Sequence, residues 1–328
     1  MRVCELRQKE VINVCDCQRI GVVADIEFDP RTGMICQLIV PGHGKWCGLF
    51  GRDMEYVIGW KCVRQIGADI ILVDVRLDEI MRMGTGAVEI KSGYGLTVDS
   101  ELKMLRVIKR LKENSPLTIK ANFLGAHGIP MEYRGRQEEY VDLVINEMMP
   151  LVATENLADF VDVFCDKGFF TVEDTERVLM AGIKYGMRPK IHANELASSG
   201  GVQVGIEYGA LSVDHLEEAN EQDVKDLAAS NTMPTVLPGA SVFSNLPFAP
   251  ARAMIDAGLP VAIASDCNPG SSPSGNMMFL WSLGCIKMRL TPEEALSALT
   301  NNGAAALGLS ADRGAISVGR RADLVVSK

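Results

Sequence analysis

Four residues in the second half of the chain have the types and spacing of a reaction centre. His192 ends a short apolar run, and Glu195 follows three residues later. Two later apolar runs end in His215 and in Asp266. Imidazole nitrogen and carboxylate oxygen are ligands of divalent metals, and a carboxylate beside a metal suits proton transfer from water. A lone histidine after a strand can be a hydrogen-bonded core residue, and Glu195 can be a solvated loop carboxylate, but the repeated pattern favours a metal site.

Further polar residues follow other apolar runs. Tyr94 and His127 come shortly after two earlier runs, so three of the four histidines of the chain stand in such places. Packing alone does not explain this distribution. After Asp266, the residues Asn268, Gly270 and Ser271 offer side-chain and backbone groups that can hold an amide or a carboxylate. A bare turn at this position would need only proline and glycine.

The elements that must position these residues are strands alternating with helices. From about residue 76, amphipathic helical patterns begin at capping residues such as Thr171 and Thr291. This alternation is typical of a parallel (β/α) barrel, which gathers its reactive residues at the carboxyl ends of the strands. One strand is missing from the usual eight, since seven runs are predicted to be strands: Ala87–Lys91, Leu117–Phe123, Phe160–Phe164, Pro189–His192, Leu211–Val213, Thr235–Leu237 and Val261–Ala264.

Residues 1–75 have a different sequence pattern from the rest of the chain. Short β-branched runs alternate with turns rich in glycine and proline, and no stretch has helical periodicity. We therefore expect a small all-β barrel or sandwich. Cys15, Cys17, His43 and Cys47 could form a metal cluster, but they lack the Cys-x-x-Cys spacing of zinc sites. We interpret His43 as a solvent-exposed histidine in a glycine-rich turn.

Composition excludes several classes of partner. The chain has 328 residues, of which 47% are hydrophobic, and a net charge of -9, which argues against nucleic acid and anionic membranes as partners. It has no apolar run of about 18 residues and no recognisable signal peptide. Its nine cysteines, an odd number, favour free thiols in a reducing cytoplasm. We expect a cytoplasmic protein with a small-molecule substrate, and a homodimer stays open.

Taken together, six runs resemble, in order, the imidazolonepropionase family of the amidohydrolase superfamily: Val88–Leu96, Leu124–His127, Phe160–Cys165, His192–Glu195, Asp214–Glu217 and Asp266–Ser271. The resemblance covers about residues 76–328, while residues 1–75 resemble the PRC-barrel domain of small bacterial sporulation-type proteins. It implies an α/β fold. An incomplete TIM-type barrel of the amidohydrolase kind, lacking its first strand, would span residues 76–310, and residues 311–328 would begin a truncated C-terminal β-sandwich.

The resemblance also implies an activity. Members of the family hydrolyse the ring amide of 4-imidazolone-5-propanoate to N-formimidoyl-L-glutamate, in histidine degradation, with one iron or zinc ion. Carried over to this chain, it makes His192 and Asp266 metal ligands, and Glu195, His215 and Asp266 catalytic residues. The substrate would be bound by Tyr94, His127, Glu195, Asn268, Gly270 and Ser271.

The sequence departs from the family in one respect. The family uses a His-x-His pair after its first barrel strand and an arginine soon after it, and neither is present here. Two of four expected ligands are therefore missing, so we expect weak or no activity from this chain. Two alternatives stay open. One is a related cyclic amidohydrolase, and the other is a non-catalytic adaptor whose barrel is vestigial.

Overall fold

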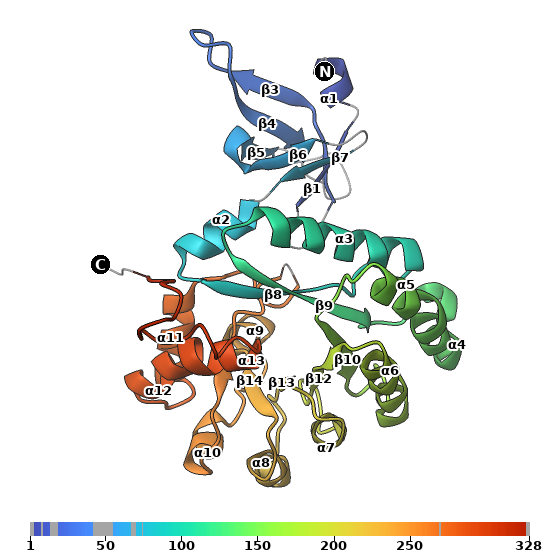
Figure 1. Cartoon of the computed structure of the whole chain (residues 1–328), viewed down its shortest axis with the longest axis vertical. Helices are drawn as coiled ribbons and strands as arrows, with labels where there is room; N and C mark the ends of the chain where they lie inside the picture. The colour runs from blue at the N-terminus through green and yellow to red at the C-terminus, as the bar shows by residue number, and fades with distance from the viewer. Residues whose placement is uncertain are drawn as a thin grey trace. The chain divides into compact units, whose positions relative to one another are not determined.

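The computed structural model of the chain describes residues 3–7, 9–13, 19–41, 55–66, 70–73, 75–268 and 270–325. The chain divides into two compact units, Met1–Arg82 and Met83–Lys328 (Figure 1). Each unit has a hydrophobic core of its own. The domain limits predicted from the sequence, at residues 75 and 310, remain predictions.

Two small sheets form the N-terminal unit. One has the order β2-β1-β7-β6, with strands Arg19–Val22, Glu10–Asn13, Ile70–Val73 and Val63–Ile66. The other has the order β3-β4-β5, with strands Asp25–Phe28, Ile35–Pro41 and Glu55–Gly59. The helices of this unit are α1 (Val3–Leu6), a 3-10 turn (Trp60–Cys62) and α2 (Val75–Arg82). Its core consists of Leu6, Val11, Ile20, Val23, Leu38, Val40 and Ile58.

A parallel sheet forms the centre of the second unit. Its order is β15-β14-β13-β12-β10-β9-β8, and β11 pairs with β10. All of these pairings are parallel. The strands are β8 (Ala87–Lys91), β9 (Thr118–Ala126), β10 (Phe160–Cys165), β11 (Arg188–Pro189), β12 (Ile191–Ala193), β13 (Ser212–His215), β14 (Met233–Val236) and β15 (Ala262–Ile263).

Most of the helices lie around the outside of this curved sheet (Figure 1). Their amphipathic faces pack onto the strands. Side chains at five helix starts accept hydrogen bonds from backbone N–H groups, and these caps are Thr97, Thr171, Asn220, Asn276 and Thr291. The α-helices are α3 (Val98–Asn114), α4 (Gln137–Leu143), α5 (Met149–Thr154), α6 (Val172–Lys184), α7 (Gly201–Glu207), α8 (Glu221–Ala228), α9 (Pro238–Ser244), α10 (Ala251–Asp256), α11 (Met277–Ile286), α12 (Pro292–Ser297) and α13 (Gly303–Ala306). Shorter turns are a 3-10 helix (Met131–Tyr133) and two π-helices (Val144–Met148 and Ala298–Asn302).

The sheet of the second unit is open. Within the described residues, β8 and β15 each pair with one neighbour, and no strand joins them. The predicted incomplete barrel is therefore confirmed. Each of the seven predicted runs overlaps a strand of the sheet, and the run Pro189–His192 is divided between β11 and β12. Residues 311–325 contain no helix or strand, and the β-sandwich predicted for residues 311–328 remains a prediction.

Candidate active site

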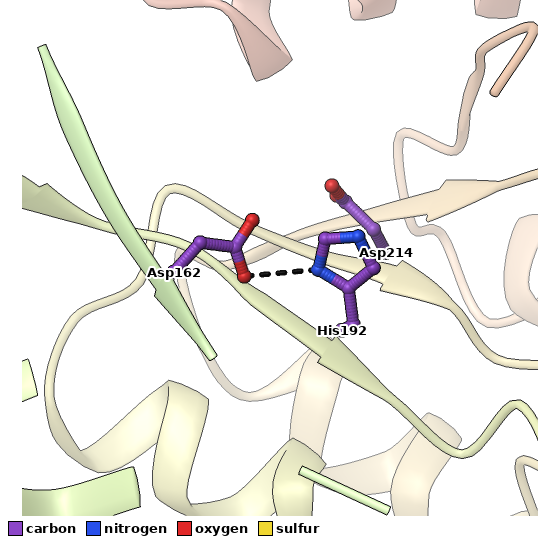
Figure 2. Close-up of side chains that lie close together, drawn as sticks. All are labelled: Asp162, His192 and Asp214. Carbon is purple, nitrogen blue, oxygen red and sulfur yellow. Dashed lines mark hydrogen bonds and ion pairs between the residues drawn. The ribbon is translucent and has the colours of Figure 1, made fainter. Parts of the chain in front are cut away.

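Asp162, His192 and Asp214 lie side by side on three neighbouring strands, β10, β12 and β13 (Figure 2). All three are buried, and one ligand atom from each lies within 4.8 Å of the others. His192 Nδ1 donates a hydrogen bond of 3.0 Å to Asp162 Oδ1. Because Nδ1 of His192 is hydrogen-bonded to Asp162, its other ring nitrogen, Nε2, is the one that can coordinate a metal ion.

Two lysines neutralise the carboxylates of this group. Lys91 Nζ lies 2.6 Å from Glu89, 3.0 Å from Asp162 and 3.2 Å from Asp214. Lys190 Nζ pairs with Glu89 and lies 3.8 Å from Asp214. Burial disfavours the charged form of Lys91, but Asp162, Glu89 and Asp214 outweigh this effect and raise its pKa well above the ordinary value. Burial likewise opposes ionisation of Asp162, yet His192 and Lys91 lower the pKa of that carboxyl.

His215, at the end of β13, joins two carboxylates. Its Nε2 lies 3.5 Å from Glu195 and its Nδ1 lies 3.4 Å from Glu217. The ring centroid is 5.3 Å from that of His192. Burial opposes protonation of His215, but Glu217 and then the charges of Asp266 and Glu195 outweigh it and raise the pKa to about 9.

Glu195 stands on a loop that Asp166 fixes. The carboxylate of Asp166 accepts hydrogen bonds from the backbone N–H groups of Glu195 at 2.7 Å, Leu196 at 3.0 Å and Ala197 at 3.1 Å. Burial raises the pKa of Glu195 above its ordinary value, although the nearby His215 opposes the shift. A carboxylate with a raised pKa is suited to accept a proton from water.

Tyr94 and His127 lie against each other, with ring centroids 4.9 Å apart. His127 Nδ1 lies 3.2 Å from the carbonyl oxygen of Gly93. A Cβ at Gly93, where φ is +110°, would lie 2.9 Å from His127 Cβ, so the close approach requires glycine. The loop is fixed by Glu101, which accepts hydrogen bonds from the N–H groups of Gly93 and two later residues. Tyr94 is exposed, which suits a residue that meets a ligand.

The turn after β15 is held together by its own side chains. Asn268 Oδ1 accepts hydrogen bonds from the N–H groups of Gly270 at 2.8 Å and Ser271 at 2.7 Å. Asn268 Nδ2 donates to the backbone oxygen of Asp266 at 2.7 Å, and Ser271 Oγ donates to Asp266 Oδ2 at 3.0 Å. Ser271 therefore orients the carboxylate of Asp266, and Asn268 Nδ2 holds Ser271 Oγ at 2.9 Å.

Several residues of the centre have a left-handed backbone although they are not glycine. Their φ values are 56° at Asn194, 87° at His215, 70° at Leu216 and 48° at Asp266. Each lies at the end of a parallel strand or just beyond it. Such conformations are unfavourable for side chains other than glycine and gather at functional sites.

The structure thus brings Glu195 and His192 each next to His215, Glu195 at 3.5 Å and the His192 ring at a centroid distance of 5.3 Å. The charge of Asp266 acts on Glu195 and His215, and also on His127. The cysteines of the suggested N-terminal metal cluster, Cys15, Cys17 and Cys47, and His43 lie outside the described residues.

Sequence reasoning did not select Asp162, Asp214, Glu217 or the two lysines. A usable signal existed for Asp162, because it is a carboxylate in the middle of the fully buried strand β10. Glu217 is fully buried too, and its Oε1 accepts a hydrogen bond of 3.1 Å from Ser241. Glu217 faces His215 and is held by Ser241, and spacing along the chain predicts neither contact.

Comparison with known proteins agrees with this geometry. Residues 93–328 match the model of the amidohydrolase family. The chain belongs to the amidohydrolase family. Residues 1–80 match the PRC-barrel domain, so this amidohydrolase carries a PRC-barrel domain at its N-terminus.

Curated relatives of this amidohydrolase are imidazolonepropionases, which confirms the resemblance predicted from the sequence. The protein of Flavobacterium johnsoniae is 56% identical over 254 residues, which cover 77% of this chain and 62% of that protein. The protein of Christiangramia forsetii is 55% identical over 253 residues, with the same two coverages. The chain therefore spans less than two thirds of the length of these relatives.

Solved structures show the same fold. The triazine hydrolase of Arthrobacter aurescens superposes with a TM-score of 0.59 at 18% identity, over 76% of this chain and 60% of that one.

Among the described residues of this amidohydrolase, no helix is both long enough and apolar enough to cross a membrane.

The side chains of His192 and Asp266 have donor atoms that suit a metal ion. Enzymes of the amidohydrolase family are metal-dependent. His192 is held by a carboxylate at Nδ1, as is usual for metal-ligating histidines. Asp266 is oriented by Ser271 through one oxygen, so its other oxygen can serve as a ligand. Imidazole and carboxylate donors suit zinc and iron.

Proposed function

We propose that this amidohydrolase hydrolyses the ring amide of 4-imidazolone-5-propanoate to N-formimidoyl-L-glutamate. The observation that carries the proposal is the meeting of His192, Glu195 and His215 at the ends of β12 and β13, with Glu195 and His215 only 3.5 Å apart. This pair supplies a proton acceptor and a proton donor beside a histidine with a ligand nitrogen. The similarity to imidazolonepropionases favours the imidazolone ring over other cyclic amides.

Two residues would move protons in this reaction. A single iron or zinc ion, held by His192 and Asp266, would supply Lewis acidity toward the amide carbonyl and the attacking water. Glu195 accepts the proton of the water that attacks the carbonyl carbon, since burial raises its pKa. His215, with a pKa raised to about 9, gives a proton to the ring nitrogen as the carbon–nitrogen bond breaks.

The substrate would lie against Tyr94 and His127. These two rings border the centre, since His127 is 5.8 Å from Phe164, which in turn is 6.0 Å from His192 between ring centroids. Phe164 thus links the aromatic pair to the proposed ligand. We propose Glu195 and the turn residues Asn268, Gly270 and Ser271 as the other residues that contact the substrate.

We expect turnover by this chain to be slow. The sequence has four histidines and no His-x-His pair, so two protein ligands would hold the metal where catalytic zinc sites usually have three. A weaker site is occupied only at a high metal concentration, and it orients its ion less well. Ordinary enzymes turn over about 1 to 1,000 substrate molecules per second, and we expect a rate below that range.

The test is hydrolysis of 4-imidazolone-5-propanoate by the purified full chain, with iron or zinc added over a wide concentration range. We expect a slow reaction that depends on metal, falls about 100-fold or more in Glu195→Gln, and is unchanged in Glu218→Gln, a neighbouring exposed acid. Absence of any hydrolysis above the Glu195→Gln background would overturn the proposed activity. Turnover at ordinary enzyme rates would overturn the expected impairment.

A further inference from the structure

Five charged side chains form a network beside His192 that the proposed reaction does not use. They come from β8, β10, β13 and the residue before β12, and they are Glu89, Lys91, Asp162, Lys190 and Asp214. Three of the ligand atoms that could surround a cation belong to Asp162, His192 and Asp214. By residue type alone, this group could hold a metal ion of its own.

Every carboxylate oxygen of the network already accepts a hydrogen bond or faces an ammonium group. One oxygen of Glu89 accepts hydrogen bonds from Lys91 and Asn122, and the other accepts one from Lys190. Asp162 Oδ1 accepts a hydrogen bond from His192. Asp162 Oδ2 accepts hydrogen bonds from Lys91 at 3.0 Å and from Asn122 at 2.7 Å. Asp214 Oδ1 accepts a hydrogen bond of 2.6 Å from Ser212, and Asp214 Oδ2 accepts one of 3.2 Å from Lys91. A cation among these three groups would therefore compete with the donors that already contact every one of their oxygens.

Charge leads to the same conclusion. Three carboxylates face two ammonium groups, so the network retains one net negative charge. A divalent ion between Asp162 and Asp214 would lie beside the ammonium of Lys91, which contacts both of them, and the two positive charges would repel each other. The raised pKa of Lys91 keeps this ammonium charged at neutral pH.

We infer that the Lys91 ammonium is a built-in cation that takes the place of a metal ion between Asp162 and Asp214. Asp162 is then a positioning residue. It is held by Lys91 at one oxygen and fixes His192 Nδ1 with the other, so that His192 Nε2 is the ligand nitrogen. The inference rests on the proposed function only in taking His192 as a metal ligand, and it limits that site to a single ion.

The first test leaves Lys91 in place. Metal bound per chain is measured by elemental analysis, after equilibrium dialysis of the full chain against Mn²⁺ or Zn²⁺, for the wild type, Asp214→Asn and His192→Ala. We expect Asp214→Asn to bind as much metal as the wild type, and His192→Ala to lose it. Loss of metal in Asp214→Asn to the same extent as in His192→Ala would show that Asp214 is a ligand and would overturn the inference.

The second test removes the built-in cation. Lys91→Met keeps the length of the side chain and leaves the network with one more uncompensated carboxylate, so it should bind one additional Mn²⁺ per chain. Combining it with Asp214→Asn should remove the additional ion. Lys120→Met is the matched control, because Lys120 is a lysine of the same sheet that pairs with Asp159 and lies outside the network.

The two tests separate this inference from the proposed function. Mn²⁺ binding by Lys91→Met that equals binding by Lys120→Met, in protein shown by circular dichroism to be folded, would overturn the built-in cation. Metal retained by His192→Ala would instead overturn the ligand assignment of the proposed function. If Lys91→Met does not fold, the Asp214→Asn comparison decides the inference.

Discussion

His127 is half-buried beside Tyr94, and its environment makes folding depend on pH. Burial, and then the nearby His192, lower the pKa of His127 from 6.5 to about 4. The unfolded chain therefore binds more protons than the folded chain between about pH 4 and pH 6.5, so the free energy of unfolding should rise with pH across this window. The contribution is at most about 3.5 kcal/mol, since one pKa unit corresponds to about 1.4 kcal/mol.

Urea denaturation at about pH 4.5 and about pH 7 would measure this contribution. We expect the difference in stability between the two pH values to be smaller in His127→Gln than in the wild type, because glutamine does not titrate. Equal pH dependence of the two proteins would show that the pKa of His127 is not lowered in the folded state.

Single residues also show how far the sequence predicts the site. His192, Glu195, His215 and Asp266 are visible in the sequence because each follows an apolar run, and the ends of parallel strands meet at one edge of a sheet. Asp162 was not selected, because its contact with His192 joins residues 30 positions apart and depends on which strands are neighbours. Strand order is a property of the folded sheet.

At the scale of elements, the loop after β12 depends on one acceptor. Asp166 follows β10 and accepts three backbone hydrogen bonds from residues 195–197. Asp166→Ala would leave these N–H groups without that acceptor, and we expect a loss of about 2 to 5 kcal/mol in the free energy of unfolding. Hydrogen exchange of the three amides should become faster, because the loop loses its fixed position.

Asp142→Ala is the matched control for that change. Asp142 is exposed and pairs only at the surface with Arg177, so its loss should cost at most about 1 kcal/mol. Equal destabilisation by the two variants, or unchanged exchange at residues 195–197 in Asp166→Ala, would show that Asp166 does not fix the loop.

The elements themselves were largely predictable. Apolar runs bounded by turns predicted the barrel strands, and helices begin after Thr171 and Thr291 as expected, each with a capping box. The N-terminal unit was less predictable, since no helix was expected in residues 1–75 and yet α1 spans the four residues Val3–Leu6. So short a segment shows no periodicity that separates strand, helix and turn.

At the scale of the whole molecule, two separate cores predict two unfolding transitions. Leu38 is fully buried in the core of the N-terminal unit, and Leu227 is fully buried in the core of the barrel unit. Replacing a buried leucine by alanine costs about 2 to 5 kcal/mol. If each unit folds around its own core, Leu38→Ala should weaken one transition and Leu227→Ala the other.

Calorimetry of the full chain tests this expectation, with Met34→Ala as the control because Met34 is 66% exposed. The control should move neither transition. The transition weakened by Leu227→Ala should be the one that a saturating divalent metal raises, since the proposed ligands His192 and Asp266 lie in that unit and a ligand stabilises the fold that binds it. A single transition, shifted equally by both leucine variants, would mean that the two units unfold as one cooperative structure. The PRC-barrel domain would then contribute to the stability of the amidohydrolase barrel.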